Sequence, residues 1–344
     1  MSTTPTLVVG LGWAGIGVLR ALDEHGIETE RTLAIDTNQQ DLAKAPDGAE
    51  KLLLSLPESR FDADRRRYPY LRTDTELPHT GTARQRTLGR YAFDNAEPPT
   101  PEAVVGTLAE TVETMITERS QDFEPAGGEV AVVWVHALGG GTGGGTFPLV
   151  AATLDSAAES AAARRGFDVK RFGLGIVPAP SADIHPDTVS SRAATHYANA
   201  YAGLRDLEHM LAADEESLEI PLYARASDGK SSIDALELDE PPVDTYFLAP
   251  VNEKQLVGDD AESYVRSVDR SVAEAVGAIS NGNAADTVDA AERFEDAAPR
   301  LLETFASFAQ EGVFDGGRES RAAMAYPEWY GRDVPAAFDI ESER

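Results

Sequence analysis

The sequence predicts an α/β protein with three layers: a parallel, Rossmann-like sheet with helices on both faces. Through the first two thirds of the chain, short apolar and β-branched runs alternate with longer amphipathic stretches. This alternation is typical of strand–helix–strand units. In addition, two glycine-rich turns stand where an apolar run gives way to a helical pattern. Turns of this kind bring main-chain N–H groups to a helix N-terminus, where anions bind. The sequence therefore predicts a nucleotide-binding domain.

The predicted elements follow one another along the chain in this order. Strands are expected at residues 6–9, 31–35, 51–56, 129–136, 171–177 and 245–249. Helices are expected from the first glycine turn to residue 22, at 151–164 and at 263–308. Residues 57–99 and 214–242 are polar and rich in turn residues, which predicts loops. We expect a nucleotide-binding domain at 1–262, a central helix with a following helical segment at 263–311, and an irregular tail at 312–344.

The charge balance is strongly acidic, with 59 Asp and Glu against 30 Lys and Arg and a net charge of −29. Such a surface cannot neutralise many phosphates, so nucleic acid is excluded as a partner. Spread acidic charge favours solubility in molar salt and predicts a halophilic, archaeal source. Cysteine is absent, no run is long enough to span a membrane, and no signal peptide is recognisable. These features predict a cytoplasmic protein.

The first glycine turn, GLGWAGIG, begins at Gly10 and directly follows an apolar run. Its candidate ligand-binding residues are Gly10, Gly12, Trp13, Ala14 and Gly15. Asp36 follows Gly15 by 21 positions, at the end of the second predicted strand. That spacing is typical of an acid that binds a ribose in a dinucleotide fold. This turn alone therefore favours an NAD or FAD protein.

The second glycine turn at 139–145 reads GGGTGGG and lies between a strongly apolar strand pattern and a helix. Six glycines there are costly in chain entropy, which a plain connector would not require. The turn predicts a nest of N–H donors for a phosphate, with Thr142 adding a hydroxyl group. Pro148 is expected in the first turn of the following helix, where its missing N–H costs nothing. No Walker-type motif occurs.

These segments resemble the tubulin/FtsZ superfamily, whose phosphate loop reads GGGTGSG or a near variant. The first glycine turn resembles its first nucleotide loop, and AIDTN at 34–38 resembles its second. HTGTAR at 79–84 resembles the third loop, which senses the terminal phosphate. The resemblance implies nucleotide contacts from all four loops: Gly10, Gly12, Trp13, Ala14, Gly15, Asp36, Asn38, Gly81, Thr82, Gly139, Gly140, Gly141, Thr142, Gly143 and Gly144.

Further segments of the resemblance lie downstream. Asp187 falls in the stretch that resembles the ribose-contacting loop. YFLAPVN resembles the strand and loop that end in the asparagine that reads guanine, and Asn252 would be that residue. Tyr264 would stack on the base from the central helix, and Asp269 is the nearest polar candidate for a second base contact. The resemblance implies GTP or GDP as ligand, with Mg²⁺ or K⁺ offsetting the phosphate charge.

The catalytic loop of the superfamily has its nearest counterpart at Asp286 and Asp289, which carry one extra spacing residue. An acidic surface helix explains these two residues equally well. We expect most of the second domain to be missing, and hence slow or absent GTP hydrolysis. Three functions stay open: a cytoskeletal or cell-division GTPase that forms dimers or short filaments, a nucleotide-binding regulatory scaffold acting through a protein partner, and an NAD- or FAD-dependent oxidoreductase.

Overall fold

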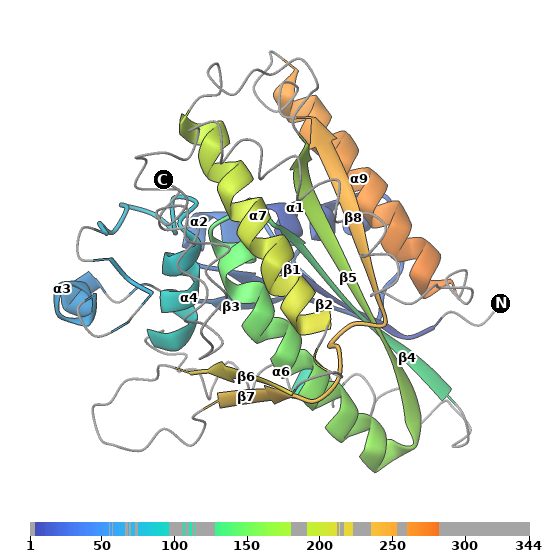
Figure 1. Ribbon diagram of the computed structural model, residues 1–344. Helices are drawn as coiled ribbons and strands as arrows, with labels where there is room; N and C mark the ends of the chain where they lie inside the picture. Colours follow the sequence, from blue (N-terminus) through green and yellow to red (C-terminus); the bar gives the residue numbers. More distant parts are fainter. Residues whose placement is uncertain are drawn as a thin grey trace.

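A computed structural model gives the arrangement of the chain (Figure 1). The residues that it describes are 4–54, 56, 58–65, 68, 70–72, 75–95, 106, 110–111, 114, 128–179, 191–211, 213, 217–222, 235–252 and 260–281. None of the helices within these ranges is long and apolar enough to cross a membrane.

Six parallel strands form the main sheet. They are β1 (Thr6–Leu11), β2 (Arg31–Asp36), β3 (Glu50–Leu53), β4 (Gly128–Ala137), β5 (Phe167–Ala179) and β8 (Thr245–Asn252). Their order is β3-β2-β1-β4-β5-β8, and every neighbouring pair is parallel. All six strands were predicted, although β4 and β5 extend further than expected and β3 is shorter. The predicted α/β fold class is confirmed.

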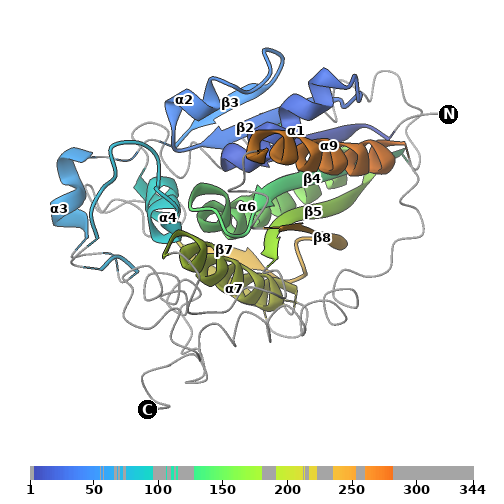
Figure 2. The ribbon, with the colours of Figure 1, turned by 90° about the horizontal axis from the view of Figure 1, so that it is seen from above.

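Helices cover both faces of this sheet (Figure 2). On one face lie α1 (Gly12–Glu24), α2 (Gln39–Leu42) and α9 (Ala261–Ser280), and on the other lie α4 (Arg86–Asn95), α6 (Thr142–Arg165) and α7 (Ser191–Leu211). The strands supply alternate residues to the two cores: Val132 and Trp134 face α6, whereas Val133 and Val135 face α1. Alternation of side chains across the pleat explains why central strands are apolar without a break.

Two stretches predicted as loops contain regular structure. Residues 214–242 include β6 (Leu218–Pro221) and β7 (Ala235–Leu238), which pair antiparallel in a separate two-stranded sheet. Residues 57–99 include η1 (Glu58–Arg60), α3 (Phe61–Asp64) and α4. The loop prediction was wrong there because α4 buries charged residues. Arg90 and Asp94 form an ion pair in the protein interior, so the polar sequence carried no sign of a buried helix.

Pro148 lies inside α6 and not in its first turn, because the helix begins within the glycine turn, at Thr142. A proline at this place cannot donate a hydrogen bond to the carbonyl group four residues earlier, which belongs to Gly144. The Arg86 guanidinium donates to that carbonyl instead, from Nε at 2.9 Å and from Nη2 at 2.7 Å. The helix therefore tolerates the proline because α4 supplies the missing donor.

Candidate functional site

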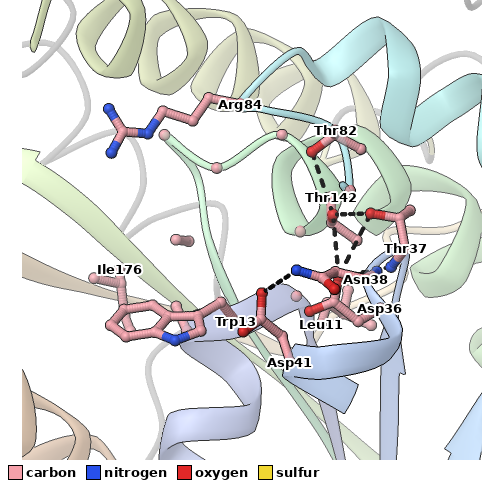
Figure 3. Close-up of a pocket in the computed structure, with 18 of the residues that line it drawn as sticks. Leu11, Trp13, Asp36, Thr37, Asn38, Asp41, Thr82, Arg84, Thr142 and Ile176 are labelled. Carbon is pink, nitrogen blue, oxygen red and sulfur yellow. Dashed lines mark hydrogen bonds between the residues drawn. The ribbon is translucent and has the colours of Figure 1, made fainter. Parts of the chain in front are cut away.

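A cavity of about 520 Å³ opens at the carboxyl edge of the sheet (Figure 3). Its walls come from the segments that follow β1, β2 and β4, together with the ends of β5 and β8 and one side of α9. The strand order reverses direction between β1 and β4, and ligands of doubly wound sheets bind at such switch points. The volume is in the usual range for a small-molecule site.

Twelve of the predicted ligand-binding residues line this cavity: Gly12, Trp13, Ala14, Asp36, Asn38, Gly81, Thr82, Gly139, Gly140, Gly141, Thr142 and Gly143. Gly10, Gly15 and Gly144 lie behind its wall. Tyr264 packs against the hydrophobic core beneath α9 and is not among the lining residues. Asn252 is the last residue of β8, with its side chain outside the described part of the structure. Asp187, Asp286 and Asp289 also lie outside the described residues.

The glycines of the first turn serve two different purposes. Gly12 has a φ of +68°, a conformation that favours glycine, and it starts α1 at the cavity wall. Gly10 and Gly15 instead allow α1 to approach the sheet. A Cβ atom on Gly15 would lie 2.6 Å from the carbonyl oxygen of Val135 and 2.6 Å from the carbonyl carbon of Gly10. These two glycines position the turn without touching the cavity.

The glycines of the second turn are required by close packing and not by backbone conformation, since none of them has a positive φ. A Cβ atom on Gly141 would lie 2.3 Å from Thr82 Oγ1 and 2.7 Å from the main chain of Arg84. One on Gly143 would lie 2.9 Å from the carbonyl oxygen of Leu11. The second turn is therefore held tightly against the first turn and against residues 82–84.

Buried polar side chains of α4 and α7 hold the second glycine turn in place. Besides its bonds to Gly144, Arg86 forms an ion pair with Asp206 of α7, and both residues are almost completely buried. Asn199 Nδ2, also on α7, donates to the carbonyl oxygens of Arg84 at 2.7 Å and of Gly139 at 3.1 Å. These contacts fix the second turn and the 79–84 segment relative to one another. Such pre-organisation lowers the entropic cost of binding a ligand.

Three threonine hydroxyl groups converge beside Asp36 at one end of the cavity (Figure 3). Thr142 Oγ1 lies 2.7 Å from Thr37 Oγ1 and 3.4 Å from Thr82 Oγ1, and it donates weakly to Asp36 Oδ1 at 3.4 Å. Each hydroxyl group comes from a different segment, following β2, preceding α4 or starting α6. The cluster is therefore a polar end of the cavity that the fold assembles from three loops.

Asp36 uses one carboxylate oxygen to shape its own loop and leaves the other free. Oδ1 accepts hydrogen bonds from the main-chain N–H groups of Thr37 at 2.6 Å and Asn38 at 3.1 Å. Oδ2 is buried and has no hydrogen-bond partner. Burial raises the pKa of this carboxyl group from 3.8 to about 6, although the two N–H groups oppose the shift. An unsatisfied buried carboxylate oxygen is costly unless a cation or a donor reaches it.

This polar end fits a hard cation such as Mg²⁺, which prefers carboxylate and hydroxyl oxygens together with phosphate and water. The Asp36 carboxyl group and the hydroxyl groups of Thr37 and Thr142 are the side-chain oxygens that would hold it. No group of three or more His, Cys, Asp or Glu side chains within the described ranges forms a self-sufficient metal site. A cation there would therefore depend on the oxygens of a phosphorylated ligand.

Arg84 places a cationic side chain in the cavity wall, in a strained stretch of backbone. Ala83 has a φ of 45° and Arg84 a φ of 67°, and they are the non-glycine residues with positive φ in the described part of the chain. Strain of this kind costs energy and concentrates at binding sites. The hydrogen bond from Asn199 to the Arg84 carbonyl group offsets part of that cost.

The opposite end of the cavity is largely apolar. It is lined by Ile176, Pro178, Val251, Val265 and Val268, with Asp269 beside them. Burial raises the pKa of Asp269 from 3.8 to about 7, partly opposed by Arg20. The cavity thus presents the second glycine turn and threonine hydroxyl groups at one end and apolar side chains at the other, with Arg84 in its wall. This is the chemistry that a nucleoside phosphate requires.

Comparison with known proteins identifies the family. The model of the family described as "Tubulin like" matches residues 67–311, which is more than half of the chain. The chain belongs to the tubulin-like family. The matched region includes the 79–84 segment and the whole second glycine turn, whereas the first glycine turn and residues 34–38 precede it. No curated protein matches the chain.

Solved structures similar to this tubulin-like chain include CetZ, FtsZ and TubZ proteins. CetZ2 from Haloferax volcanii, a GTPγS-bound protofilament, is 17% identical over 85% of this chain and 62% of that one, with a TM-score of 0.44. A mutant FtsZ of M. jannaschii is 18% identical over 80% and 56%, with a TM-score of 0.44. TubZ of Clostridium botulinum phage c-st is 12% identical over 80% and 58%, with a TM-score of 0.39. The chain thus spans about three fifths of the length of these proteins.

Three residues that shape the site of this tubulin-like protein were not predicted from the sequence: Thr37, Arg84 and Arg86. Thr37 and Arg84 stand inside segments recognised as nucleotide loops, so their positions carried a usable signal. Arg86 carried none, because its role depends on Pro148, 62 positions away in the chain, and on Asp206 in α7.

Proposed function

We propose that this tubulin-like protein binds GTP and GDP in the cavity at the carboxyl edge of its sheet. The observation that carries the proposal is the pairing of two glycine turns, at 10–17 and 139–145, around one cavity with a polar and an apolar end. Main-chain N–H groups at the starts of α1 and α6 would bind the phosphates, as helix N-termini do. The base would lie at the apolar end, near α9.

Mg²⁺ or K⁺ would bind between the phosphates and the oxygens of Asp36, Thr37 and Thr142. When bound, the cation supplies positive charge that offsets the phosphate oxygens. The two N–H groups that hold Asp36 Oδ1 fix the carboxyl group and leave Oδ2 without a hydrogen-bond partner. Arg84 would add charge at the outer side of the phosphates, which explains how a site without lysine in its loops binds a polyanion.

The geometry argues against a dinucleotide oxidoreductase. In such enzymes an acid at the position of Asp36 reaches the ribose hydroxyl groups. Here Asp36 is 3% exposed, and its oxygen Oδ1 is already engaged by two N–H groups of its own loop. The hydroxyl groups of Thr37 and Thr142 lie 3.5 Å and 3.4 Å from this same oxygen, Oδ1. That environment favours a cation over a ribose.

For the cellular role, we propose a cytoskeletal or cell-division protein of a halophilic archaeon that acts in the cytoplasm through dimers or short filaments. GTP hydrolysis is expected to be weak or absent, because the candidate carboxylates Asp286 and Asp289 depart from the superfamily spacing. A misplaced carboxylate loses orders of magnitude in rate. The same departure supports the second candidate, a regulatory scaffold that binds nucleotide and acts through a protein partner.

Sedimentation and phosphate release in molar KCl separate these two roles. A filament-forming GTPase sediments when loaded with GTP, and its turnover per chain rises steeply with protein concentration. A scaffold binds GTP but stays in the supernatant, with turnover that does not depend on concentration. Asp286→Ala should abolish a concentration-dependent rise in turnover. The Asp289→Ala variant then shows whether turnover requires Asp286 alone or both carboxylates. Binding of neither GTP nor GDP would contradict the proposed function itself.

A further inference from the structure

Trp13 is a large apolar side chain that the fold leaves exposed. It is the second residue of α1, directly after Gly12, and 52% of its surface is accessible. It belongs to neither of the hydrophobic cores, although its neighbours Leu11 and Ile16 are both buried there. Simple packing, the role that its apolar character suggests, therefore does not account for it. A tryptophan exposed at a concave site usually contacts a ligand or a partner.

The surroundings of Trp13 favour a ligand. Trp13 lines the cavity, and in Figure 3 its indole extends toward Ile176, away from the cluster of Thr37, Thr82 and Thr142. Among the described lining residues it is the only Phe, Tyr or Trp. Tyr264, the aromatic residue expected to stack on a base, is partly buried, packs against the core beneath α9 and does not line the cavity. The apolar end of the cavity thus has one flat aromatic surface, and Trp13 provides it.

We infer that the indole of Trp13 stacks on the base of the bound nucleotide and closes the apolar end of the cavity. This inference rests on the proposed function, because it assumes that a nucleoside phosphate occupies the site. The aliphatic side chains of Ile176, Val265 and Val268 would support the base from the other sides. Stacking does not depend on the hydrogen-bonding edge, so Trp13 contributes affinity for purine nucleotides in general. Selection of guanine must come from polar groups elsewhere.

Ligands with and without a base test this role. Calorimetry in molar KCl compares GDP with pyrophosphate for the wild type, Trp13→Phe and Trp13→Ala. Loss of one stacked base weakens binding by between about 5- and 150-fold, so Trp13→Ala should lose that much affinity for GDP and Trp13→Phe less. The affinity for pyrophosphate should stay the same in all three proteins. Because Trp13 is exposed, both variants are expected to unfold at the denaturant concentration of the wild type.

Intrinsic fluorescence gives a second readout. The chain has three tryptophans, of which Trp134 is buried in β4. The Trp329→Phe substitution leaves Trp13 and Trp134 as the tryptophans of the chain. In that variant GDP should quench the tryptophan fluorescence in a saturable way, whereas ribose 5-phosphate and pyrophosphate should not. The quenching should disappear in Trp13→Phe.

Three results would overturn the inference. If the Trp13→Ala variant binds GDP as tightly as the wild type does, Trp13 does not stack on the base. Equal losses of affinity for GDP and pyrophosphate would mean that the substitution distorts the first glycine turn. Unchanged GDP affinity with altered sedimentation would assign Trp13 to a protein contact. Each of these leaves the proposed function intact, whereas a wild-type protein that binds neither GDP nor GTP contradicts the proposed function and this inference together.

Discussion

Arg86 donates two hydrogen bonds to the main-chain oxygen of Gly144, at 2.9 Å from Nε and 2.7 Å from Nη2. Because Pro148 has no N–H to offer, the guanidinium replaces a helix hydrogen bond. It also neutralises Asp206, so one buried cation satisfies a carbonyl group and a carboxylate. The position of the second glycine turn therefore depends on contacts between α4, α6 and α7.

Arg86→Met should destabilise the fold severely, because it leaves the Asp206 carboxylate buried without a counterion. Breaking such a pair costs about 3–5 kcal/mol. The matched variants are Asp206→Asn and the double variant with Arg86→Met, in which the loss should be smaller than the sum of the single losses. Urea unfolding at constant KCl concentration measures all three. Small and additive losses would mean that the pair is not coupled.

Thr142→Val should weaken Mg²⁺-dependent binding of GTP by about tenfold or more, since it removes a hydroxyl group at the centre of the threonine cluster while keeping the shape of the side chain. Thr153→Val is the control: Thr153 is buried in the same helix and donates only to the carbonyl group of Leu149. Calorimetry with and without Mg²⁺ separates the two effects. If both variants bind GTP equally well, the cluster does not hold the cation.

Asp36→Asn should change how stability depends on pH in the nucleotide-free protein. The folded-state pKa of Asp36 is raised from 3.8 to about 6, so between these values the folded protein holds a proton that the unfolded chain has released. Stability therefore falls as pH rises through this window, by about 3 kcal/mol in total. Asparagine keeps the acceptor for Thr37 and Asn38 and does not titrate.

The difference in unfolding free energy between the Asp36→Asn variant and the wild type should therefore grow from pH 4 to pH 7 in favour of the variant. Urea unfolding in the presence of a chelator measures it. Asp269, whose pKa is raised to about 7, and His136, whose pKa is lowered to about 3, titrate in both proteins and cancel in this difference. A difference that stays constant across the pH range would show that Asp36 is not buried as described.

Arg84→Gln should reduce affinity for GTP more than for GDP. The 79–84 segment lies at the cavity wall, and its resemblance to the loop that senses the terminal phosphate predicts a contact that only the triphosphate makes. A charge-assisted hydrogen bond of this kind is worth about tenfold or more in affinity. Arg270→Ala, which removes an exposed arginine paired with Glu274, should change neither affinity. Equal losses for GTP and GDP would place Arg84 away from the terminal phosphate.

The sequence predicted the sheet and the two glycine turns because both depend on local signals. Apolar runs mark buried parallel strands, and glycine marks a turn that must pack closely, as Gly10 and Gly15 do. The glycines of the two turns meet different structural needs. Gly12 requires its positive φ, whereas Gly141 and Gly143 are needed for space beside Thr82 and Leu11. Spacing alone cannot distinguish these causes.

Contacts between distant segments were beyond the reach of sequence patterns. The helix α4 was missed because segments distant in the sequence bury its charged residues. Arg86 pairs with Asp206, Arg90 donates to the carbonyl oxygen of Pro221, and Asp94 accepts from Tyr70. The packing of Tyr264 against the core, away from the cavity lining, also depends on how α9 lies against α1. There Asp269 stands so close to Gly17 that a Cβ atom would lie 2.5 Å from its carboxylate. Helix rotation of this kind follows from packing and is not encoded in a motif.

Equilibrium binding of nucleotides to the full chain in molar KCl with Mg²⁺ tests the central claim most directly. GTP, GDP, ATP, NAD⁺ and FAD are each titrated calorimetrically, with the stoichiometry measured. We predict one site per chain for GTP and GDP, with affinities roughly tenfold or more above those for ATP, because a site that hydrogen-bonds one base rejects another. Preferential binding of NAD⁺ or FAD, or no binding of any of the five, would contradict the account.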